Sequence, residues 1–385
     1  MPAVWTYPWN LYTEGPEDAF ATLREHGIDT VNLATSYHSV RSMNPRTPEQ
    51  LFVERPGGLY FDPGDAFADV PITPRVDDGA GVADQLADLC TRAEAENITV
   101  NAWTVCLHNS RLGAKNPDFR IESAFGDAHD HSLCPSHQAV RDYFAALAGA
   151  IATYDIGEIQ LESVGFPGVF HGHSNTFGHD KRAVLTDQVE EVLLSQCFCS
   201  GCREAATDLD MDAAQTVVRE LVTEAMANPH DGLPSLEALT VEYPVLDDLF
   251  SFRASVVTEL VEAIADAAGD VPVNYYVGEA FGFDVEDLWP SGVRLTELAG
   301  HVDRFTALCY VSDPAVARRR LGSVQELVDE PVDVGLTLDP EAVPDADTLA
   351  TLVEAVRAET DGDVFVYHHG LASEAQLEWI ADAIR

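Results

Sequence analysis

The chain has 385 residues, of which 46% are hydrophobic, enough to build one large core. Its 65 acidic residues against 22 basic ones leave a formal net charge of −43. A surface so negative repels nucleic acid and anionic membranes, which excludes both as partners. Only Lys115 and Lys181 are lysines, and the acidic residues are spread through helical segments, so we interpret the composition as the solvated surface of a halophilic protein.

Eight apolar runs typical of strands recur along the chain, and most precede a segment with apolar residues at helical spacing. Strands that alternate with helices and are apolar throughout predict a parallel sheet covered on both faces. Eight such units predict a (β/α)8 barrel, whereas an open doubly wound sheet would need a glycine-rich phosphate turn that no strand has. The predicted strands cover residues 4–9, 29–38, 98–109, 158–164, 271–278, 304–312, 332–339 and 363–370.

Two predicted connections are too long for simple turns. Residues 39–81, rich in proline and glycine, follow the second strand, and residues 165–252, with helical patterns of their own, follow the fourth. In a barrel both begin at the C-terminal rim, where active sites are built, so we expect them to form pocket walls or lids. No repeat or flexible linker divides the chain, and we expect one barrel domain over residues 1–385, with 165–252 as a helical excursion.

The N-terminal segment has no basic stretch followed by an apolar one, and no run approaches the ~18 apolar residues of a membrane-spanning helix. We therefore expect a cytoplasmic enzyme without a membrane partner. A homo-oligomer is compatible with the sequence.

Aromatic and polar side chains accumulate at the predicted C-terminal ends of the strands. Aromatic faces stack on the C–H faces of sugar rings, while carboxylates, imidazoles and amides bind hydroxyls, so the mixture predicts a carbohydrate site. For any single aromatic, packing inside the barrel is the alternative. The candidate substrate-binding residues are Trp5, Tyr7, Tyr37, His38, Trp103, His108, Asn109, Tyr276, Tyr310 and His368.

Glycoside hydrolysis needs one carboxyl group with a raised pKa to protonate the leaving oxygen, and one ionised carboxylate as nucleophile or base. Glu162 fits the first role because it ends an apolar strand with no cation adjacent in sequence; an ion pair with an arginine from another strand is the alternative. Asp339, after the seventh strand, would face it across the ring. Glu279 and Asp313 are the other candidates, and either could instead cap a turn or helix.

The segment CFCSGC places Cys197, Cys199 and Cys202 within six residues. These thiols could hold one tetrahedral zinc ion, with a fourth ligand from Cys134 or a nearby histidine. Closed four-thiolate coordination is structural, and it would fasten the long excursion to the barrel. Free thiols without a metal are the main alternative, and an iron–sulfur cluster is a weaker one.

A second metal hypothesis concerns His171, His173, His179 and Asp180 in the segment FHGHSNTFGHD. This pattern could hold a catalytic zinc ion with an open coordination position. The alternative is a lid loop that lines a polar pocket with histidines.

With Glu162 after strand four, and CFCSGC preceded by Cys134 in HSLCPSHQ, the chain resembles a clan of (β/α)8 glycoside hydrolases. In that clan the general acid/base is a glutamate after strand four, and the family 42 β-galactosidases and related barrels are the most similar. The resemblance implies that Glu162 is the acid/base and that Cys134 completes a structural zinc site. The clan usually has asparagine before this glutamate and a glutamate nucleophile on strand seven, where this chain has Leu161 and Asp339.

The sequence therefore predicts a glycosidase that acts on a small or oligomeric carbohydrate without an organic cofactor. Two alternatives stay open. One is a metal-dependent hydrolase built on His171 and His173, and the other is a barrel that binds carbohydrate without cleaving it.

Overall fold

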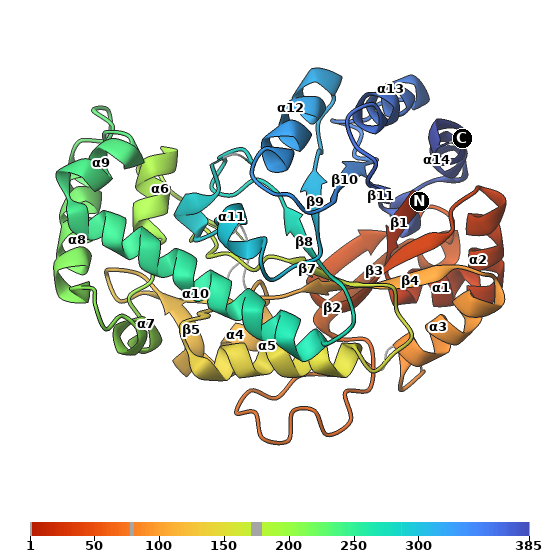
Figure 1. Ribbon diagram of the computed structural model, residues 1–385, viewed down its shortest axis with the longest axis horizontal. Coiled ribbons are helices and arrows are strands. Elements are labelled where there is room, and N and C mark those ends of the chain that lie inside the picture. Colours follow the sequence, from red (N-terminus) through yellow and green to blue (C-terminus); the bar gives the residue numbers. More distant parts are fainter. Residues whose placement is uncertain (1, 78–80, 171–178, 286, 385) are drawn as a thin grey trace.

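The structure is a computed structural model that describes residues 2–77, 81–170, 179–285 and 287–384. Eight parallel strands form a closed barrel, which confirms the predicted (β/α)8 fold (Figure 1). The ring closes because β1 (Pro2–Thr6) pairs with both β2 (Thr30–Met43) and β11 (Val364–Tyr367). The strands between them, in ring order, are β4 (Thr99–Val105), β7 (Ile159–Glu162), β8 (Val273–Val277), β9 (Arg304–Leu308) and β10 (Val332–Thr337).

Helices surround the barrel and pack against one another in chain order, with α5 against α10, α12 against α13 and α13 against α14. In α5 the buried residues Val140, Tyr143, Phe144, Leu147 and Ile151 recur at helical spacing, so one face covers the sheet. The helices nearest the barrel are α1 (Pro8–Glu14), α2 (Pro16–Glu25), α3 (Gln85–Ala95), α5 (Gln138–Ile151), α10 (Pro244–Ala268), α11 (Leu295–Leu298), α12 (Pro314–Gln325), α13 (Ala346–Arg357) and α14 (Glu374–Ile384). Single 3-10 turns lie at η1 (Pro48–Gln50), η2 (Pro117–Phe119), η3 (Trp289–Ser291) and η4 (His369–Leu371).

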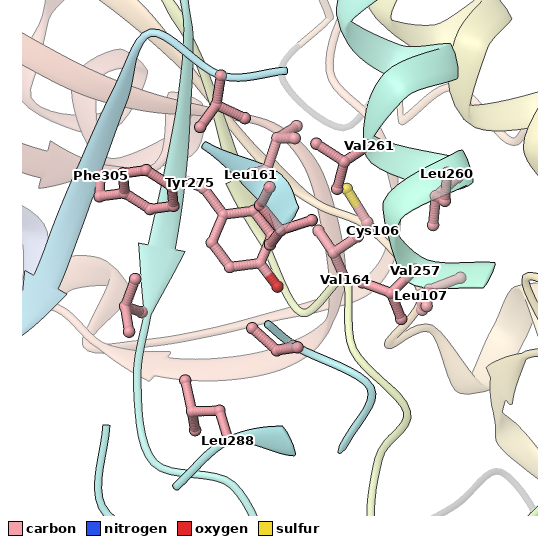
Figure 2. Packing of buried hydrophobic residues seen from close by; sticks show 14 of the residues in the cluster. Cys106, Leu107, Leu161, Val164, Val257, Leu260, Val261, Tyr275, Leu288 and Phe305 are labelled. Atoms are coloured by element: carbon pink, nitrogen blue, oxygen red, sulfur yellow. The ribbon is translucent and has the colours of Figure 1, made fainter. Parts of the chain in front are cut away.

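Alternation along each strand divides the core into two parts. Leu161 of β7 and Tyr275 of β8 point outward, where Val257 and Val261 of α10 pack against them (Figure 2). The alternate positions point into the barrel, which is filled largely by aromatic rings. This inner cluster contains Trp5, Tyr7, Trp9, Tyr37, Tyr60, Trp103, Tyr276 and Phe365.

Three long connections leave the C-terminal ends of strands. After β2, which continues to Met43, β3 (Phe52–Leu59) returns antiparallel to it, so the first part of 39–81 is a hairpin. The connection after β4 was missed from the sequence, because the apolar run was followed to residue 109. It contains α4 (Ser110–Lys115) and the hairpin of β5 (Arg120–Glu122) and β6 (Ala128–Leu133).

The connection after β7 carries α6 (Gln188–Leu194), α7 (Ser200–Ala205), α8 (Met211–Ala227) and α9 (Leu236–Glu242), which Figure 1 shows to one side of the barrel. It ends earlier than the predicted residue 252, since α10 begins at Pro244. Proline suits the first turn of a helix, so Pro244 marks this start. Among the described residues no helix is both long and apolar enough to cross a membrane.

Candidate functional site

Strand β7 presents Glu162 at the mouth of the barrel. Gln160 and Glu162 alternate inward on β7, and the strand ends at once because Ser163 has a left-handed backbone with φ 59°. The parallel register pairs Gln160 with Trp103 and Glu162 with Val105. The Trp103 ring therefore lies one layer below the carboxyl group and reaches up to it.

The Glu162 carboxyl has one hydrogen-bond donor in the described part of the chain, Trp103 Nε1, which donates to Oε2 over 2.6 Å. Burial raises the pKa of this carboxyl, and the Trp103 hydrogen bond offsets the rise only in part. No arginine or lysine among the described residues forms an ion pair with it. The group is thus a half-buried carboxyl whose pKa lies above its usual value.

Glu162 lines a cavity of about 330 Å³ at the C-terminal end of the barrel. This volume lies within the range of small-molecule sites. The walls come from residues 163–168 after β7 and residues 278–281 after β8, with His108 and Ser132 from the connection after β4. The cavity therefore combines one protonatable acid with aromatic, apolar and hydroxyl surfaces.

Glu279 is the only other carboxylate that lines this cavity in the described part of the chain. Its Oε1 accepts a hydrogen bond from Arg320 Nη2, and the side chain is 53% exposed. The Arg320 guanidinium also contacts Asp284 Oδ1 over 2.7 Å. Glu279 therefore has a balancing cation, whereas Glu162 has none among the residues that the structure describes.

Asp339 does not line the cavity. The strand β10 ends at Thr337, two residues before Asp339, the residue predicted to end this strand. The chain has therefore already left the strand at Asp339. The exposed Asp339 carboxylate accepts the Glu341 backbone N–H over 2.8 Å and closes a turn. Asp313 caps α12 by accepting the Ala315 N–H over 2.8 Å, which confirms the capping role given as the alternative for this residue.

Two of the ten candidate substrate-binding residues, His108 and Tyr276, line the cavity. His38 lies behind them, its ring stacked on His108 at 4.5 Å between centroids. Asn109 caps α4 by accepting the Leu112 N–H over 3.0 Å. Tyr310 is 39% exposed outside this cavity.

The other five candidates, Trp5, Tyr7, Tyr37, Trp103 and His368, are buried in the aromatic packing below Glu162. The Tyr7 hydroxyl hydrogen-bonds those of Tyr37 and Tyr367, each over 3.0 Å. Trp5 Nε1 donates to Tyr276 Oη over 2.8 Å. These contacts hold the layer that supports Trp103 and, through it, Glu162.

Phe166 and Phe281 line the cavity but drew no attention in the sequence. They lie in two separate loops, and neither sits at a strand end where the alternation would reveal it. Phe281 also has a left-handed backbone with φ 55°, which is rare for an aromatic residue and is found at functional sites. The sequence around Phe281 gives no indication of this conformation.

Four cysteines from two separate segments meet away from the mouth. Cys134 follows β6, while Cys197, Cys199 and Cys202 lie before and within α7, and all four sulfurs lie within 4.8 Å of one another. The Sγ–Sγ distances are 3.5 Å from Cys134 to Cys202, 3.8 Å from Cys134 to Cys197 and 3.6 Å from Cys199 to Cys202. A disulfide needs ~2.05 Å, whereas four thiolates ~2.3 Å from a tetrahedral zinc ion lie ~3.8 Å apart. The spacing fits a tetrahedral metal site.

The surroundings of this cluster favour the thiolate form of Cys199 and Cys202, whereas burial raises the pKa of Cys134 and Cys197. Hydrogen bonds from Cys134 and then from the other two thiols hold the pKa of Cys199 well below its usual range. The buried Arg253 donates from Nη1 to Cys202 Sγ over 3.0 Å. His137 Nε2 lies 3.4 Å from Cys199 Sγ, outside the group of four sulfurs. Thiolate is the form that binds metals, so the geometry of the four sulfurs and the lowered pKa of two of them fit a metal ion.

The histidine-based metal hypothesis falls largely outside the described residues, because His171 and His173 are among the residues not described. His179 is exposed and Asp180 is half-buried. A site built on these residues stays a prediction.

No family model and no curated protein matches the sequence. Solved structures match the fold. The catalytic domain of β-amylase from Paenibacillus polymyxa is 10% identical with a TM-score of 0.55, over 100% of this chain and 97% of that one. The β-galactosidase from the psychrophilic Marinomonas ef1 is 11% identical with a TM-score of 0.53, over 100% of this chain and 59% of that one.

The α-L-fucosidase isoenzyme 2 from Paenibacillus thiaminolyticus is 12% identical with a TM-score of 0.52, over 95% of this chain and 45% of that one. The chain thus spans about half the length of the fucosidase and somewhat more of the β-galactosidase. These structural neighbours are (β/α)8 glycoside hydrolases. At such low identity the likeness establishes the barrel fold alone.

Proposed function

We propose that this chain is a glycoside hydrolase-like enzyme that cleaves a small or oligomeric carbohydrate, with Glu162 as its general acid/base. The observation that carries the proposal is the position of the Glu162 carboxyl, which ends the fourth barrel strand and lines the mouth cavity, where burial raises its pKa. The fold of the structural neighbours supports the same reaction class. The acidic composition supports a salt-rich setting for the enzyme.

The hydrogen bond from Trp103 engages one of the two oxygens of Glu162. Because Trp103 Nε1 donates to Oε2, that oxygen must keep a lone pair toward the ring. In this proposal Oε1, which accepts no hydrogen bond from the described residues, carries the acid proton to the leaving oxygen of a bound glycoside. Trp103 is thus a positioning residue, and the aromatic packing below it keeps the carboxyl group oriented.

Glu279 is the candidate for the ionised carboxylate, as base or nucleophile. It lines the same cavity, and its ion pair with Arg320 balances a negative charge near the mouth. Asp339 is not part of this proposal, since its carboxylate closes a turn outside the cavity. The two glutamates then have different environments, as acid and base must.

The test uses two substrates that differ in their need for an acid. A 4-nitrophenolate leaving group departs with little protonation. The leaving oxygen of an alkyl glycoside or a disaccharide, in contrast, must be protonated by an acid. We expect Glu162→Gln to lower kcat by ~10²–10⁴-fold on the second kind and much less on the first. Equal, small effects on both kinds would remove Glu162 from the mechanism.

A barrel that binds carbohydrate without cleaving it is the second candidate function. The observation that favours it is the engagement of Glu279 by Arg320, which leaves Glu162 without a free partner acid among the described residues. In that case Glu162→Gln would leave carbohydrate affinity nearly unchanged, and the wild type would show no turnover. Calorimetric titration beside the activity assay separates the two functions.

We further propose that Cys134, Cys197, Cys199 and Cys202 hold a structural zinc ion. The sulfur spacing and the burial of all four side chains support closed coordination without an open position. Such a site would join the hairpin connection after β4 to the excursion after β7. No reaction step depends on it.

For the zinc site, we expect one zinc ion per chain by elemental analysis of the purified protein. Cys199→Ser should lose most of that zinc and lower the melting temperature, because the site links two long connections. Cys90→Ser is the matched control, since Cys90 lies on α3 outside the cluster. Full zinc content in Cys199→Ser would contradict the proposal.

A further inference from the structure

A second, much smaller cavity lies between the β2–β3 hairpin and α4. Its volume is about 40 Å³, and its lining includes the cations Arg75, Arg111 and Lys115, together with Asn109 and Thr73. No carboxylate among the described residues lines it. Lys115 is one of the two lysines of the chain.

This gathering of cations is unusual for the chain, in which acids outnumber bases about three to one. Ten arginines form ion pairs with acids, but Arg75, Arg111 and Lys115 form none with any described residue. Burial and then the charge of Arg75 lower the pKa of Arg111, with Asp77 as the opposing charge. Like charges held this close cost free energy unless something negative lies between them.

Besides its positive charges, the cavity has hydrogen-bond donors in its lining, which also includes the apolar side chains of Leu59 and Leu112. Asn109 uses Oδ1 to accept the Leu112 N–H, which leaves its amide N–H groups for the cavity. Arg111 Nη1 donates to the Gly57 carbonyl over 3.3 Å, which fixes one side of the guanidinium and leaves its other N–H groups available. The cavity thus offers N–H and O–H donors and three positive charges.

The size of the cavity limits the ligand. One water molecule needs roughly 10–15 Å³ of such volume. A volume of about 40 Å³ therefore holds a carboxylate or a tetrahedral oxyanion, and excludes a sugar ring.

We propose that this cavity is an oxyanion-binding site, which takes a sulfate, phosphate or carboxylate group. Arg111 and Arg75 bind the oxygens through their N–H groups, as guanidinium groups do with such anions. Lys115 adds charge, and Asn109 adds a neutral donor. The anion removes the repulsion between the two guanidinium groups.

The position relative to the mouth suggests where the anion comes from. Asn109 lines this cavity and the preceding residue, His108, lines the cavity of Glu162. Neighbouring Cα atoms are ~3.8 Å apart, so one short segment separates the two sites. An acidic group carried on a glycan could reach the small cavity while a neighbouring sugar occupies the mouth; this source, unlike the site itself, rests on the proposed function.

The test is calorimetric titration of inorganic sulfate at constant ionic strength into wild type, Arg111→Gln and Arg219→Gln. Arg219, on α8, is the matched control because it too lacks an ion pair with the described residues, yet lies outside the cavity. We expect saturable binding of one sulfate per chain, at least tenfold weaker in Arg111→Gln and unchanged in Arg219→Gln. Absence of saturable binding, or equal weakening in both variants, would overturn the proposal.

Thermal melting separates binding from a structural role of Arg111. In sulfate-free buffer Arg111→Gln should melt at the wild-type temperature or above it, since the repulsion from Arg75 is gone, but should lose the rise caused by sulfate. A variant that melts lower and keeps the sulfate-induced rise would contradict the site. If Arg111→Gln does not fold, the same measurement is made on Arg75→Gln, because the Arg75 side chain is exposed.

Two further binding titrations identify the source of the anion. Oligomers of galacturonic acid are compared with neutral galactose oligomers of equal length, in wild type and Arg111→Gln. A preference for the acidic oligomer that Arg111→Gln abolishes assigns the site to the substrate, and binding of sulfate alone assigns it to a free ion. Sulfate binding should persist in Glu162→Gln, so failure of the catalytic proposal and failure of this one are distinguishable.

Discussion

The two ends of the barrel interior each contain a carboxyl group, but the hydrogen-bond partners of the two groups differ. At the floor, Asp333 of β10 is fully buried and accepts hydrogen bonds from Arg304 and Asn274, the latter over 3.0 Å, and from the Asp363 backbone N–H over 2.7 Å. At the mouth, Glu162 has Trp103 as its donor and a cavity beside it.

Burial raises the pKa of both carboxyl groups, and the offsetting groups make the difference. Arg304 and Asn274 partly offset the rise for Asp333, and their hydrogen bonds to it tie β8, β9 and β10 together. No cation in the described part of the chain pairs with Glu162, so only the Trp103 hydrogen bond offsets the rise of its pKa. An acid with several partners stabilises a fold, whereas an acid with few partners beside a cavity can do chemistry.

The largest expected effect is on stability at the floor. Asp333→Asn would turn an acceptor into a donor that faces Arg304 and Asn274, and we expect the free energy of unfolding to fall by about 3 kcal/mol. Glu162→Gln, the matched change at the mouth, should unfold at about the wild-type denaturant concentration. Urea unfolding of both variants checks the contrast, and a similar loss in both would show that Glu162 too serves the fold.

The second prediction concerns the pH dependence set by Trp103. A general acid must be protonated, so activity should fall as the pH rises through the pKa of Glu162, which burial places above its usual value. The Trp103 hydrogen bond lowers this pKa, and Trp103→Phe should therefore move the alkaline limb of kcat/KM to higher pH.

Trp5→Phe is the control for that profile. Trp5 belongs to the same aromatic packing, but its N–H donates to Tyr276 rather than to Glu162. It should leave the alkaline limb in place. A shift of equal size in both variants would assign the effect to packing and not to the hydrogen bond.

The smallest expected effect is that of Asp339→Asn. Its carboxylate closes an exposed turn outside the cavity, and asparagine can accept the same backbone hydrogen bond. We expect kcat within about twofold of wild type and a change in stability within ~0.5 kcal/mol. A loss of turnover comparable with that of Glu162→Gln would make Asp339 the partner acid, as its place in the chain first indicated.

Much of the fold follows from local pattern. The apolar runs around Val4, Leu161 and Val334 are buried on the barrel, because continuous apolar strands need cover on both faces. The hairpin at β5 and β6 was missed, since its segment AHDHSL carries more polar than apolar side chains. Its residues His131, Ser132 and Leu133 are nonetheless buried against neighbouring elements.

For the candidate site, the sequence determined the groups that depend on one strand or one short segment. Glu162 could be placed at the mouth because it ends an apolar strand, and the cysteines of CFCSGC could be grouped because six residues contain all three. Only the tertiary structure decided which distant groups line the same cavity. Phe281 shares one cavity with Glu162, Arg75 shares another with Arg111, and Asp339 lines neither. Strand alternation is a local property of the backbone, whereas the path of a long connection depends on packing between segments far apart in the chain.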